Sequence, residues 1–594
     1  MKTHFLKSSG PISLLMVLLL IVQGYGLYGA DASRDAKPFT LTIAHLNDSH
    51  ANLEPSPLTI TVNGTKTYTT MGGFPAVTAK VQQLRQTRKN FLFLDAGDVF
   101  QGSLYFIKYR GLADLEFLKL MKLDAMCTGN HEFDKGPVAL RIFISGAQKQ
   151  FPVLAANISA EKERFLAGKL KPYEIKKFGS RKVGIIGITT TETPAVSSPG
   201  QRLVFNDPIP VVKTLAAELT RKGVDIIIVL SHQGFQNDIA LAKAVDNIDV
   251  VVGGHTHTLL GRFEALPEIS PEAEYPYVVK NPQQDTVLIV QAWEKSKILG
   301  VLEVAFDNAG KVVNYSGQPV FLTGNKPTDF QQKNADGQKE PVDAETFKAI
   351  ADFIEKDPAL EMKPENKKAD ALLAKFSAPI LKLKQEIIGR SEVDLWHVRQ
   401  PGDKHETAGV LDNGSMIAPV VADALLWKAK SLKNKNTQIV IQNAGGVRGD
   451  LPAGDITIGQ VYELLPFGNT LVLLDLNGAD LKQALKAVIL KADGAFPYPA
   501  GLRYAVDYNK ADDDFFLIVQ VETNDGWFDL KDDEIYHIAV NSFIASGKDG
   551  YTVFGNAKDK DDTGFGDAEI FMEYLKTAKA LTSPKSRVKV IKKR

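Results

Sequence analysis

The sequence contains almost no cysteine and no excess of either charge. Cys127 is the only cysteine in 594 residues, so neither an internal disulfide nor a cysteine-based zinc site can form within the chain. Any metal ion must therefore be held by histidine, aspartate, asparagine or glutamate. Lysine plus arginine and aspartate plus glutamate both number 70, so the overall charge does not favour a nucleic-acid-binding protein.

Long apolar runs are also missing after the first 30 residues, and no internal repeat or low-complexity tract is present. The N-terminus has a basic start, an apolar run at 12–22 and small residues up to Ala32. This order is typical of a signal peptide, so we expect residues 1–32 to direct export to the periplasm or the medium, with cleavage after Ala32 or nearer Gly24. An uncleaved anchor is the alternative, but the apolar run is short for a bilayer that needs about 20 residues.

The chain is too long for one ordinary hydrophobic core, so several domains are expected. Its composition, 44% hydrophobic and 24% charged, is that of a soluble globular protein. Shifts in composition predict the signal peptide at 1–32, a first α/β domain at 33–324, a polar connector with a helix at 325–377, a second α/β domain at 378–580, and a basic tail at 581–594. We expect the tail to be a frayed, solvated chain end.

In the first half, short apolar runs repeatedly end in polar clusters. Such runs, separated by helical patterns, predict buried strands of a layered α/β domain. The five runs that carry these clusters begin at Leu41, Phe91, Ala125, Ile226 and Val250. Since sites in such sheets lie beyond the carboxyl ends of the strands, we expect the five clusters to converge.

The clusters supply seven candidate metal ligands: Asp48, His50, Asp98, Asn130, His232, His255 and His257. These nitrogen and oxygen donors suit Zn, Mn or Fe. Seven ligands are too many for one catalytic ion, whereas a pair of ions that shares a carboxylate is suited to phosphoryl transfer. Each cluster alone could be a polar loop, a surface turn or a helix cap; their joint occurrence at strand ends favours the metal centre. We expect Asp48-x-His50 and His255-x-His257 to be extended, with alternate residues on one side.

The stretch GNHEFD at 129–134 adds a candidate catalytic pair. Residues three apart share one face of a helical turn, so Asp134 can orient His131 and stabilise its charged form. A simple helix-start interaction is the alternative.

Together these blocks resemble the signature of the calcineurin-like metallophosphoesterases. The GNHEFD variant, the exported N-terminus and the second half resemble the bacterial 5′-nucleotidase family, which includes UDP-sugar hydrolases and NAD nucleotidases. The resemblance covers nearly all of 40–575 apart from the connector. It implies a four-layer α/β/β/α sandwich, a helical connector and a C-terminal α/β nucleotide-binding domain. The motifs that carry it are Asp48-Ser-His50, Gly97-Asp98-x-x-x-Gly102-Ser103, GNHEFD, Ser231-His232 and Gly254-His255-Thr256-His257.

The resemblance also implies a role for each ligand. One divalent ion is expected at Asp48, His50, Asp98 and His257, and a second at Asp98, Asn130, His232 and His255, with Asp98 as the bridge. His131, supported by Asp134, is expected to stabilise the developing charge on phosphate or to protonate the leaving oxygen. Some periplasmic relatives carry Gln in place of His257, so the preferred metal can differ between them and this chain.

The second half contains loops suited to a nucleotide. Glycines after Asn443 permit close backbone approach, and Arg448 offers a two-pronged donor for phosphate. The resemblance implies that Phe467 and Phe543 sandwich the base, that Asn443 binds the base, Asp549 the ribose and Arg448 the phosphate. For the two phenylalanines, core packing is the alternative.

Two departures from the family pattern concern this substrate site. Lys548 stands where a glycine commonly precedes the ribose-binding aspartate, and the arginine-bearing segment before the second domain's first helix matches poorly. Arg399, in the segment Trp396-His-Val-Arg399, is a candidate for a further phosphate contact. That segment and Gln442–Arg448 are most similar to those of NAD nucleotidases.

The sequence therefore predicts an exported two-metal hydrolase of nucleoside 5′-monophosphates, with NAD and UDP-sugar pyrophosphates as further candidate substrates. A 2′,3′-cyclic nucleotide phosphodiesterase is one alternative. A non-catalytic nucleotide-binding protein is another, although decay of the metal site would have removed ligands and all seven are present.

Overall fold

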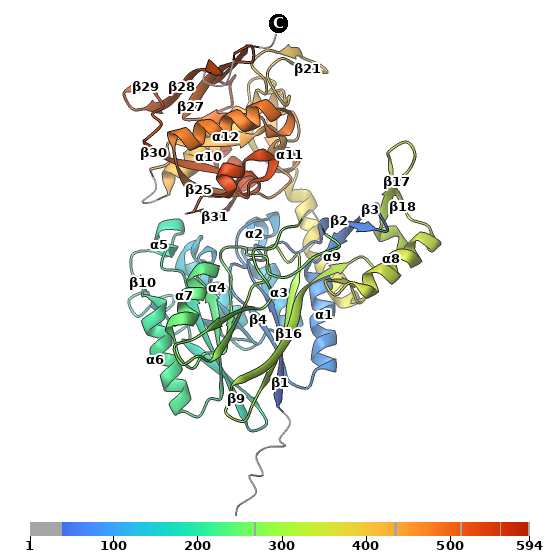
Figure 1. Ribbon diagram of the computed structural model, residues 1–594, viewed down its shortest axis with the longest axis vertical. Coiled ribbons are helices and arrows are strands. Elements are labelled where there is room, and N and C mark those ends of the chain that lie inside the picture. The colour runs from blue at the N-terminus through green and yellow to red at the C-terminus, as the bar shows by residue number, and fades with distance from the viewer. Residues whose placement is uncertain (1–37, 267–268, 433–435, 511–513, 559, 592–594) are drawn as a thin grey trace, which may run out of the picture. The chain divides into compact units, whose positions relative to one another are not determined.

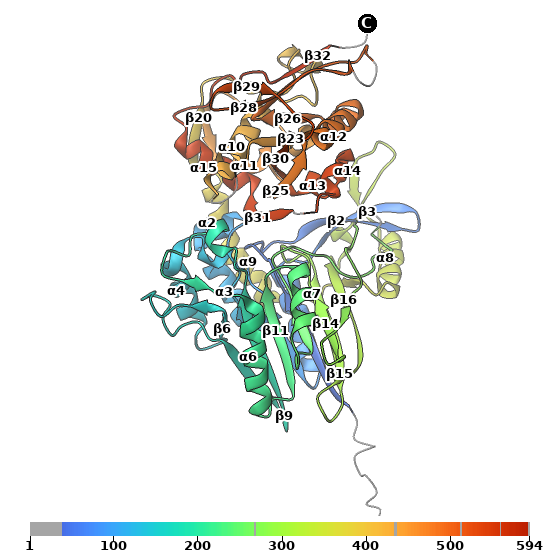
Figure 2. The same ribbon diagram turned by 60° about the vertical axis from the view of Figure 1, so that its left-hand side comes forward.

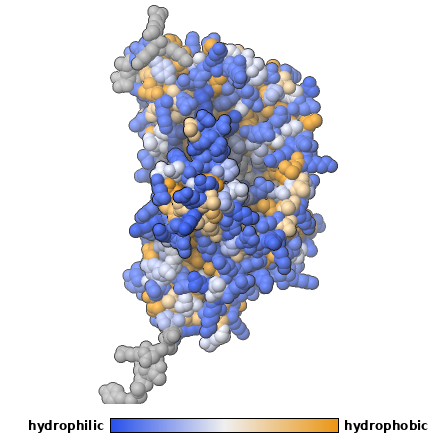
Figure 3. Space-filling model, turned by 90° about the vertical axis from the view of Figure 1, so that its right-hand side faces the viewer, coloured by the Kyte–Doolittle hydropathy of each residue, from blue (hydrophilic) through white to orange (hydrophobic). Residues whose placement is uncertain are grey.

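The computed structural model describes residues 38–591 apart from 267–268, 433–435, 511–513 and 559. The predicted signal peptide lies outside the described residues. From Phe39 onward the chain forms one compact unit. Every helix of the described part is too short or too polar to span a lipid bilayer. The face drawn in Figure 3 carries mainly hydrophilic side chains, with apolar ones in small groups.

The first half is built on two β-sheets. The first runs in the spatial order β18 (Lys339–Pro341), β17 (Gln331–Lys333), β3 (Thr65–Met71), β16 (Val312–Thr323), β15 (Leu299–Phe306), β1 (Phe39–Leu46), β4 (Phe91–Asp95), β5 (Ala125–Cys127) and β6 (Val153–Leu154), with β2 (Ser56–Val62) beside β3 and β19 (Leu360–Met362) beside β16. The second runs in the order β13 (Tyr277–Lys280), β14 (Thr286–Val290), β12 (Val250–Val252), β11 (Ile226–His232), β9 (Arg181–Thr189) and β8 (Tyr173–Phe178).

The two sheets pack face to face between layers of helices. Successive residues of a strand point to opposite faces, and β1 shows the result. Ile43 lies in one core with Ile186 and Ile228 of the second sheet, whereas Ala44 lies in another core with Val77 of the helix α1. The first sheet is covered by α1 (Phe74–Thr87), α3 (Leu112–Met121) and α4 (Gly136–Ala147), and the second by α6 (Pro208–Arg221) and α7 (Phe235–Ala244). Figures 1 and 2 show these layers, which confirm the α/β/β/α sandwich.

Parallel strands direct their carboxyl ends to one edge of each sheet. In the first sheet β1, β4, β5 and β6 run parallel, and in the second β9, β11, β12 and β14 do. The five strands predicted to carry polar clusters are β1, β4, β5, β11 and β12, and all five are present. The loops that follow them are therefore brought together by the topology.

The second half contains a five-stranded sheet in the order β26 (Pro497–Ala500), β23 (Ile439–Asn443), β30 (Ile535–Asn541), β25 (Thr470–Asn477) and β31 (Asp561–Gly566). The helices α10 (Ile417–Ser431), α12 (Gly478–Lys491) and α15 (Asp567–Thr577) contribute buried residues to the same core. A further sheet has the order β29 (Gly526–Asp529), β28 (Phe516–Thr523), β27 (Leu502–Asp507) and β32 (Val588–Ile591).

Two predictions about this half differ from the structure. The connector helix is present as α8 (Ala344–Lys356), but a second helix, α9 (Lys367–Leu383), runs across the expected domain start at 378. The expectation of a frayed tail is wrong for Val588–Ile591, which pairs in parallel with β27. The alternating valines of the Val-Lys-Val-Ile segment favour a strand. The edge of β27 offers this segment backbone hydrogen-bond partners, so it joins the sheet.

Candidate active site

All seven predicted ligands lie in segments that end or follow a strand. Asp48 and His50 follow β1, Asp98 follows β4, Asn130 follows β5, His232 ends β11, and His255 and His257 follow β12. Five of them are at most 1% exposed, and the side chains of His255 and His257 are 10% exposed. Burying charged and polar groups costs free energy unless each group has a hydrogen-bond, ion-pair or metal partner.

Six of the seven ligands form two groups whose donor atoms lie within 4.8 Å of one another: Asp48 with His50 and His257, and Asp98 with His232 and His255. His257 Nε2 lies 3.5 Å from Asp48 Oδ1, and His232 Nε2 lies 3.0 Å from Asp98 Oδ2. The groups are adjacent, because His232 Nε2 is also 3.8 Å from Asp48 Oδ1.

The donor set fits divalent metal ions. His50 Nδ1 lies 3.2 Å from the carbonyl oxygen of Phe100, and His232 Nδ1 lies 2.7 Å from that of Ala96. A carbonyl can only accept, so in the neutral rings Nδ1 carries the hydrogen and Nε2 presents a lone pair.

Asn130 Oδ1 is buried and accepts no hydrogen bond, which leaves a lone pair for a cation. The Nε2 atoms of His50 and His257 lie 3.0 Å apart, where one ring donates to the other. Burial alone would raise the pKa values of Asp48 and Asp98, but neighbouring histidines hold both below their usual range, so both carboxylates are ionised as metal binding requires.

The backbone of the ligand loops differs from the prediction. Asp48-x-His50 and His255-x-His257 are not extended, because all four residues have positive φ, from 46° for His50 to 80° for His255. Left-handed conformations are costly for residues other than glycine and collect at functional sites. Here they turn the chain sharply at the ends of β1 and β12, which brings the side chains to one point.

His131 and Asp134 form the predicted pair. His131 is the first residue of the single helical turn η1 (His131–Phe133), and Asp134 directly follows that turn. His131 Nδ1 lies 2.6 Å from Asp134 Oδ2. Ser197 Oγ donates to the other carboxylate oxygen at 2.6 Å. Burial alone would lower the pKa of His131, but Asp134 and Asp98 raise it to about 10. The imidazole is therefore positively charged at neutral pH, with its Nδ1–H held by Asp134.

The contact of the cluster with Glu294 was not predicted from the sequence. Glu294 Oε2 lies 3.3 Å from His257 Nδ1, which orients that ring as the carbonyls orient His50 and His232. The loop that carries Glu294 is held by Asn47 Nδ2, which donates to Trp293 O, and by Lys295 N, which donates to Asp48 O. Glu294 follows β14, the parallel neighbour of β12, so a search of every strand end for carboxylates would have found it.

The predicted nucleotide residues of the second half lie along loops of the five-stranded sheet. Asn443 Nδ2 donates to Asp549 Oδ2 at 3.2 Å, and the Arg448 guanidinium lies 5.5 Å from the centre of the Phe467 ring. Phe467 is 53% and Phe543 is 42% exposed, which argues against core packing for either ring. Ser542 Oγ accepts a hydrogen bond from Thr470 N, so the segments of the two phenylalanines are joined.

Arg399, predicted from a poorly matched segment, lies at the same loops. A Cβ atom at Gly494 would lie 2.6 Å from Arg399 Nη1, and one at Gly445 would lie 3.4 Å from it. Glycine at 494 is therefore required for the guanidinium to occupy this place. Arg399 borders Asn443, whose Nδ2 is 3.4 Å from the carbonyl oxygen of Gly494.

Contacts within the compact unit join the metal ligands to the nucleotide loops. Lys295 donates through its backbone N–H to Asp48 O and through Nζ to Gly468 O, next to Phe467. The Phe565 ring lies edge-on to His131 with 5.4 Å between ring centres. The metal cluster and the loops that carry Phe467 and Phe543 thus border one another.

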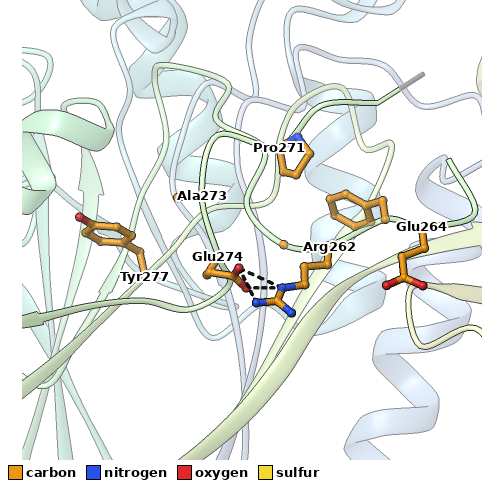
Figure 4. A pocket seen from close by; sticks show the side chains of 8 residues that line it. Arg262, Glu264, Pro271, Ala273, Glu274 and Tyr277 are labelled. Carbon is orange, nitrogen blue, oxygen red and sulfur yellow. Dashed lines mark hydrogen bonds and ion pairs between the residues drawn. The ribbon is translucent and has the colours of Figure 1, made fainter. Parts of the chain in front are cut away.

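A surface hollow of about 560 Å³ lies elsewhere, lined among others by Phe263 and Tyr277. Figure 4 shows Arg262 and Glu274 at this hollow, paired at 2.7 Å. None of the predicted site residues lines this hollow. Its two paired side chains, Arg262 and Glu274, already form an ion pair with each other. The chemistry is therefore assigned to the buried cluster rather than to this hollow.

Comparison with known proteins agrees with this geometry. Residues 41–259 match the family model described as calcineurin-like phosphoesterase, and residues 387–556 match the 5′-nucleotidase C-terminal domain. The chain is 35% identical to a probable 5′-nucleotidase of Treponema pallidum, an alignment that covers 92% of this chain and 93% of the relative. It is 34% identical to the NAD 5′-nucleotidase of Haemophilus influenzae, covering 92% of each.

Solved structures show the same likeness. The structure of the Haemophilus influenzae NAD nucleotidase matches with a TM-score of 0.80 at 32% identity, covering 94% of this chain and all of the other. A 5′-nucleotidase precursor from Thermus thermophilus matches with a TM-score of 0.56 at 40% identity, again covering 94% of this chain and all of the other.

Proposed function

Because the chain belongs to the 5′-nucleotidase family of metal-dependent phosphoester hydrolases, we propose that it releases phosphate from nucleoside 5′-monophosphates with the help of two divalent ions. The observation that carries this proposal is the pair of adjacent ligand groups bordered by exposed phenylalanines. The ligands provide the phosphoryl chemistry, and the aromatic loops provide a place for a base.

The two groups of donor atoms support a division of the ligands between two ions, and the family pattern adds Asn130 and the shared Asp98 to it. Asp48, His50 and His257 would hold one ion, and His232, His255 and Asn130 the other, with Asp98 between them. When bound, the two ions would polarise the phosphate and lower the pKa of the attacking water. Zn and Mn both suit these nitrogen and oxygen donors.

His131 supplies positive charge beside the cluster. Its Nδ1–H is fixed by Asp134, so Nε2–H, which lies beside Gly564 of the second half, is the donor that remains for a substrate. From there it donates to a phosphate oxygen as charge develops and can pass a proton to the leaving nucleoside oxygen. Ser197 holds Asp134 in place through the second carboxylate oxygen.

The nucleotide would be read by the loops of the second half. Phe467 and Phe543 would stack on the two faces of the base, Asn443 would bind its edge, and Asp549 would bind the ribose. Arg448 and Arg399 would contact phosphate groups. Exposed rings on Gly-rich loops suit a flat ligand, since stacking gains come from desolvating aromatic faces.

NAD is the favoured second substrate. The likeness to the Haemophilus influenzae NAD nucleotidase extends over 94% of this chain. Two arginines, Arg448 and Arg399, would serve two phosphate groups, with Arg399 exchanging its ion pair with Asp493 for the second one. We propose that the enzyme also cleaves the pyrophosphate of NAD and then dephosphorylates the AMP that results. The basic and apolar start of the sequence supports export, with the reaction in the periplasm or the medium.

One assay series tests the function. The mature protein is incubated with AMP, NAD, UDP-glucose and 2′,3′-cyclic AMP, each with Mn²⁺, Zn²⁺ or Co²⁺ and each with a chelator control. We expect metal-dependent release of phosphate from AMP and formation of AMP from NAD. Exclusive turnover of the cyclic nucleotide would replace the proposal by the phosphodiesterase alternative, and tight binding without turnover would make the chain a binding protein.

A further inference from the structure

Glu132 lies within the GNHEFD stretch, yet none of the roles above uses it. Its side chain is fully buried, and its carboxylate accepts four backbone hydrogen bonds. Oε2 accepts from Asp98 N at 2.9 Å and from Gly129 N at 2.6 Å. Oε1 accepts from Val99 N at 2.8 Å and from Phe100 N at 3.1 Å.

These four donors belong to two different ligand loops. Asp98, Val99 and Phe100 follow β4, whereas Gly129 follows β5, the parallel neighbour of β4. Three successive N–H groups that converge on one acceptor form a concave anion site. One carboxylate therefore joins the loop that carries Asp98 to the loop that carries Asn130 and His131.

The arrangement around Glu132 leaves little freedom to either loop. Asp98 has a φ of 57°, a left-handed conformation that needs compensation. Its Oδ1 accepts from His131 N at 2.9 Å, which is a second link between the loops. A Cβ atom at Gly129 would lie 2.1 Å from Asp98 Oδ1, so the loops touch directly. The unpartnered Asn130 Oδ1 lies two residues from Glu132, on the second of the joined loops.

We propose that Glu132 is a positioning residue of the metal centre, which sets the distance between the bridging Asp98 and the ligand Asn130 by clamping the two loops. This inference rests on the proposed two-metal centre. Glu132 itself touches no substrate. Its four hydrogen bonds replace the solvent that the buried backbone N–H groups would otherwise lack.

Glu132→Gln tests the clamp. The neutral amide keeps the shape of the side chain, but its NH₂ group must face at least one pair of N–H donors. We expect the variant to bind Mn²⁺ about 10- to 100-fold more weakly than the wild type, the range found when groups that orient metal ligands are removed. Affinity is measured on the metal-free full chain by competition with a chromogenic chelator, which does not depend on activity.

Glu163→Gln is the matched control. Glu163 is also a buried glutamate that accepts a backbone hydrogen bond, from Phe165 N at 3.2 Å, but its loop carries none of the predicted ligands. We expect this variant to keep wild-type Mn²⁺ affinity. Equal weakening in both variants would overturn the proposal, because any buried carboxylate would then have the same effect.

The melting temperatures of the metal-free and metal-loaded proteins separate positioning from a merely structural role. A clamp predicts that Glu132→Gln loses most of the increase in melting temperature that Mn²⁺ gives the wild type. An unchanged increase, with unchanged affinity, would overturn the proposal even if the variant were less stable throughout. If the Gln variant does not fold, Glu132→Asp takes its place; its shorter side chain cannot reach both loops, and wild-type affinity in that variant would also overturn the clamp.

Mn²⁺ binding to the wild-type protein distinguishes failure of the Glu132 proposal from failure of the proposed function. Wild-type protein that binds fewer than two Mn²⁺ ions would contradict the two-metal function. Weak binding confined to the Glu132 variant would leave that function intact.

Discussion

At the scale of single residues, burial changes the chemical role of common charged side chains. Asp98 shows this most clearly: it is 1% exposed, lies 3.0 Å from His232 and borders both ligand groups. A shared bridge predicts that Asp98→Asn abolishes hydrolysis and lowers metal occupancy at both positions. Elemental analysis of the purified variant provides the count, and two full equivalents of metal would contradict the bridge.

Asp114 offers a matched control for that substitution. It is also a fully buried aspartate, and burial raises the pKa of its carboxyl group well above the usual range. We expect Asp114→Asn to keep two metal equivalents and wild-type turnover, since Asp114 belongs to neither ligand group and asparagine has the same shape.

His131 should separate catalysis from metal binding. In the proposed mechanism its charge, held by Asp134, would act on the substrate and not on the metals, so His131→Ala is expected to lower kcat for AMP by about 10²- to 10⁴-fold. Metal content, measured on the same preparation, should stay near two equivalents. Loss of metal from this variant would show instead that His131 is a ligand.

Residue types and order were enough to predict that seven metal-type donors lie at strand ends, and six of them form two groups in the structure. Parallel strands bring their carboxyl ends together, whatever conformation the loops adopt. The left-handed backbone of Asp48 and His255 was not predicted, because Asp and His adopt positive φ more often than most residues but also occupy many other conformations. Glu294 was not predicted because its partner, His257, is distant in sequence and becomes its neighbour only through the order of the strands in the sheet.

At the scale of elements, the central strands of the second sheet position one edge of the site. β11 lies between β9 and β12, and Ile228 at its middle is fully buried. Ile228→Ala removes buried methyl groups and leaves a cavity, so we expect it to lower the free energy of unfolding by about 2–5 kcal/mol. Denaturant unfolding of the metal-free protein measures this, and a loss below about 1 kcal/mol would show that the sheets repack around the gap.

The loops after the strands of the second half should control substrate affinity. Phe467 and Phe543 are each expected to contribute on the order of 1–3 kcal/mol to base binding. The double substitution by alanine should therefore raise KM for AMP about 10²-fold or more, while hydrolysis of bis(p-nitrophenyl) phosphate, which has no base, should barely change.

Phe528→Ala is the control for the double variant, because Phe528 is similarly exposed, at 54%, but lies on β29 of a separate sheet. It should leave KM for AMP unchanged. An equal loss on both substrates in the double variant would mean that the rings support the fold, and unchanged AMP kinetics would mean that these loops do not read the base.

The elements themselves were largely predictable where apolar runs were continuous. Buried strands such as β11 and β12 carry uninterrupted Ile and Val and were found. The hairpin of β2 and β3 and the terminal β32 were not, because their alternating, polar-rich segments gain stability from partners that only the folded chain supplies.

At the scale of the whole molecule, the chain combines the candidate metal ligands in its first half with the predicted nucleotide loops in its second, joined by contacts such as that of Lys295 with Gly468. Length and composition could not predict that α9 crosses the expected boundary at 378, because the sequence alone does not show which core its buried face joins.

The central claim is that the first half of the chain holds two divalent ions for the hydrolysis of a nucleotide that the second half binds. Titration of Mn²⁺ into the metal-free mature protein, with phosphate release from AMP followed at each step, tests this most directly. We predict no activity before metal is added and a rise that reaches its plateau at two equivalents of Mn²⁺ per chain. Phosphate release without metal, or a plateau at one equivalent, would contradict it.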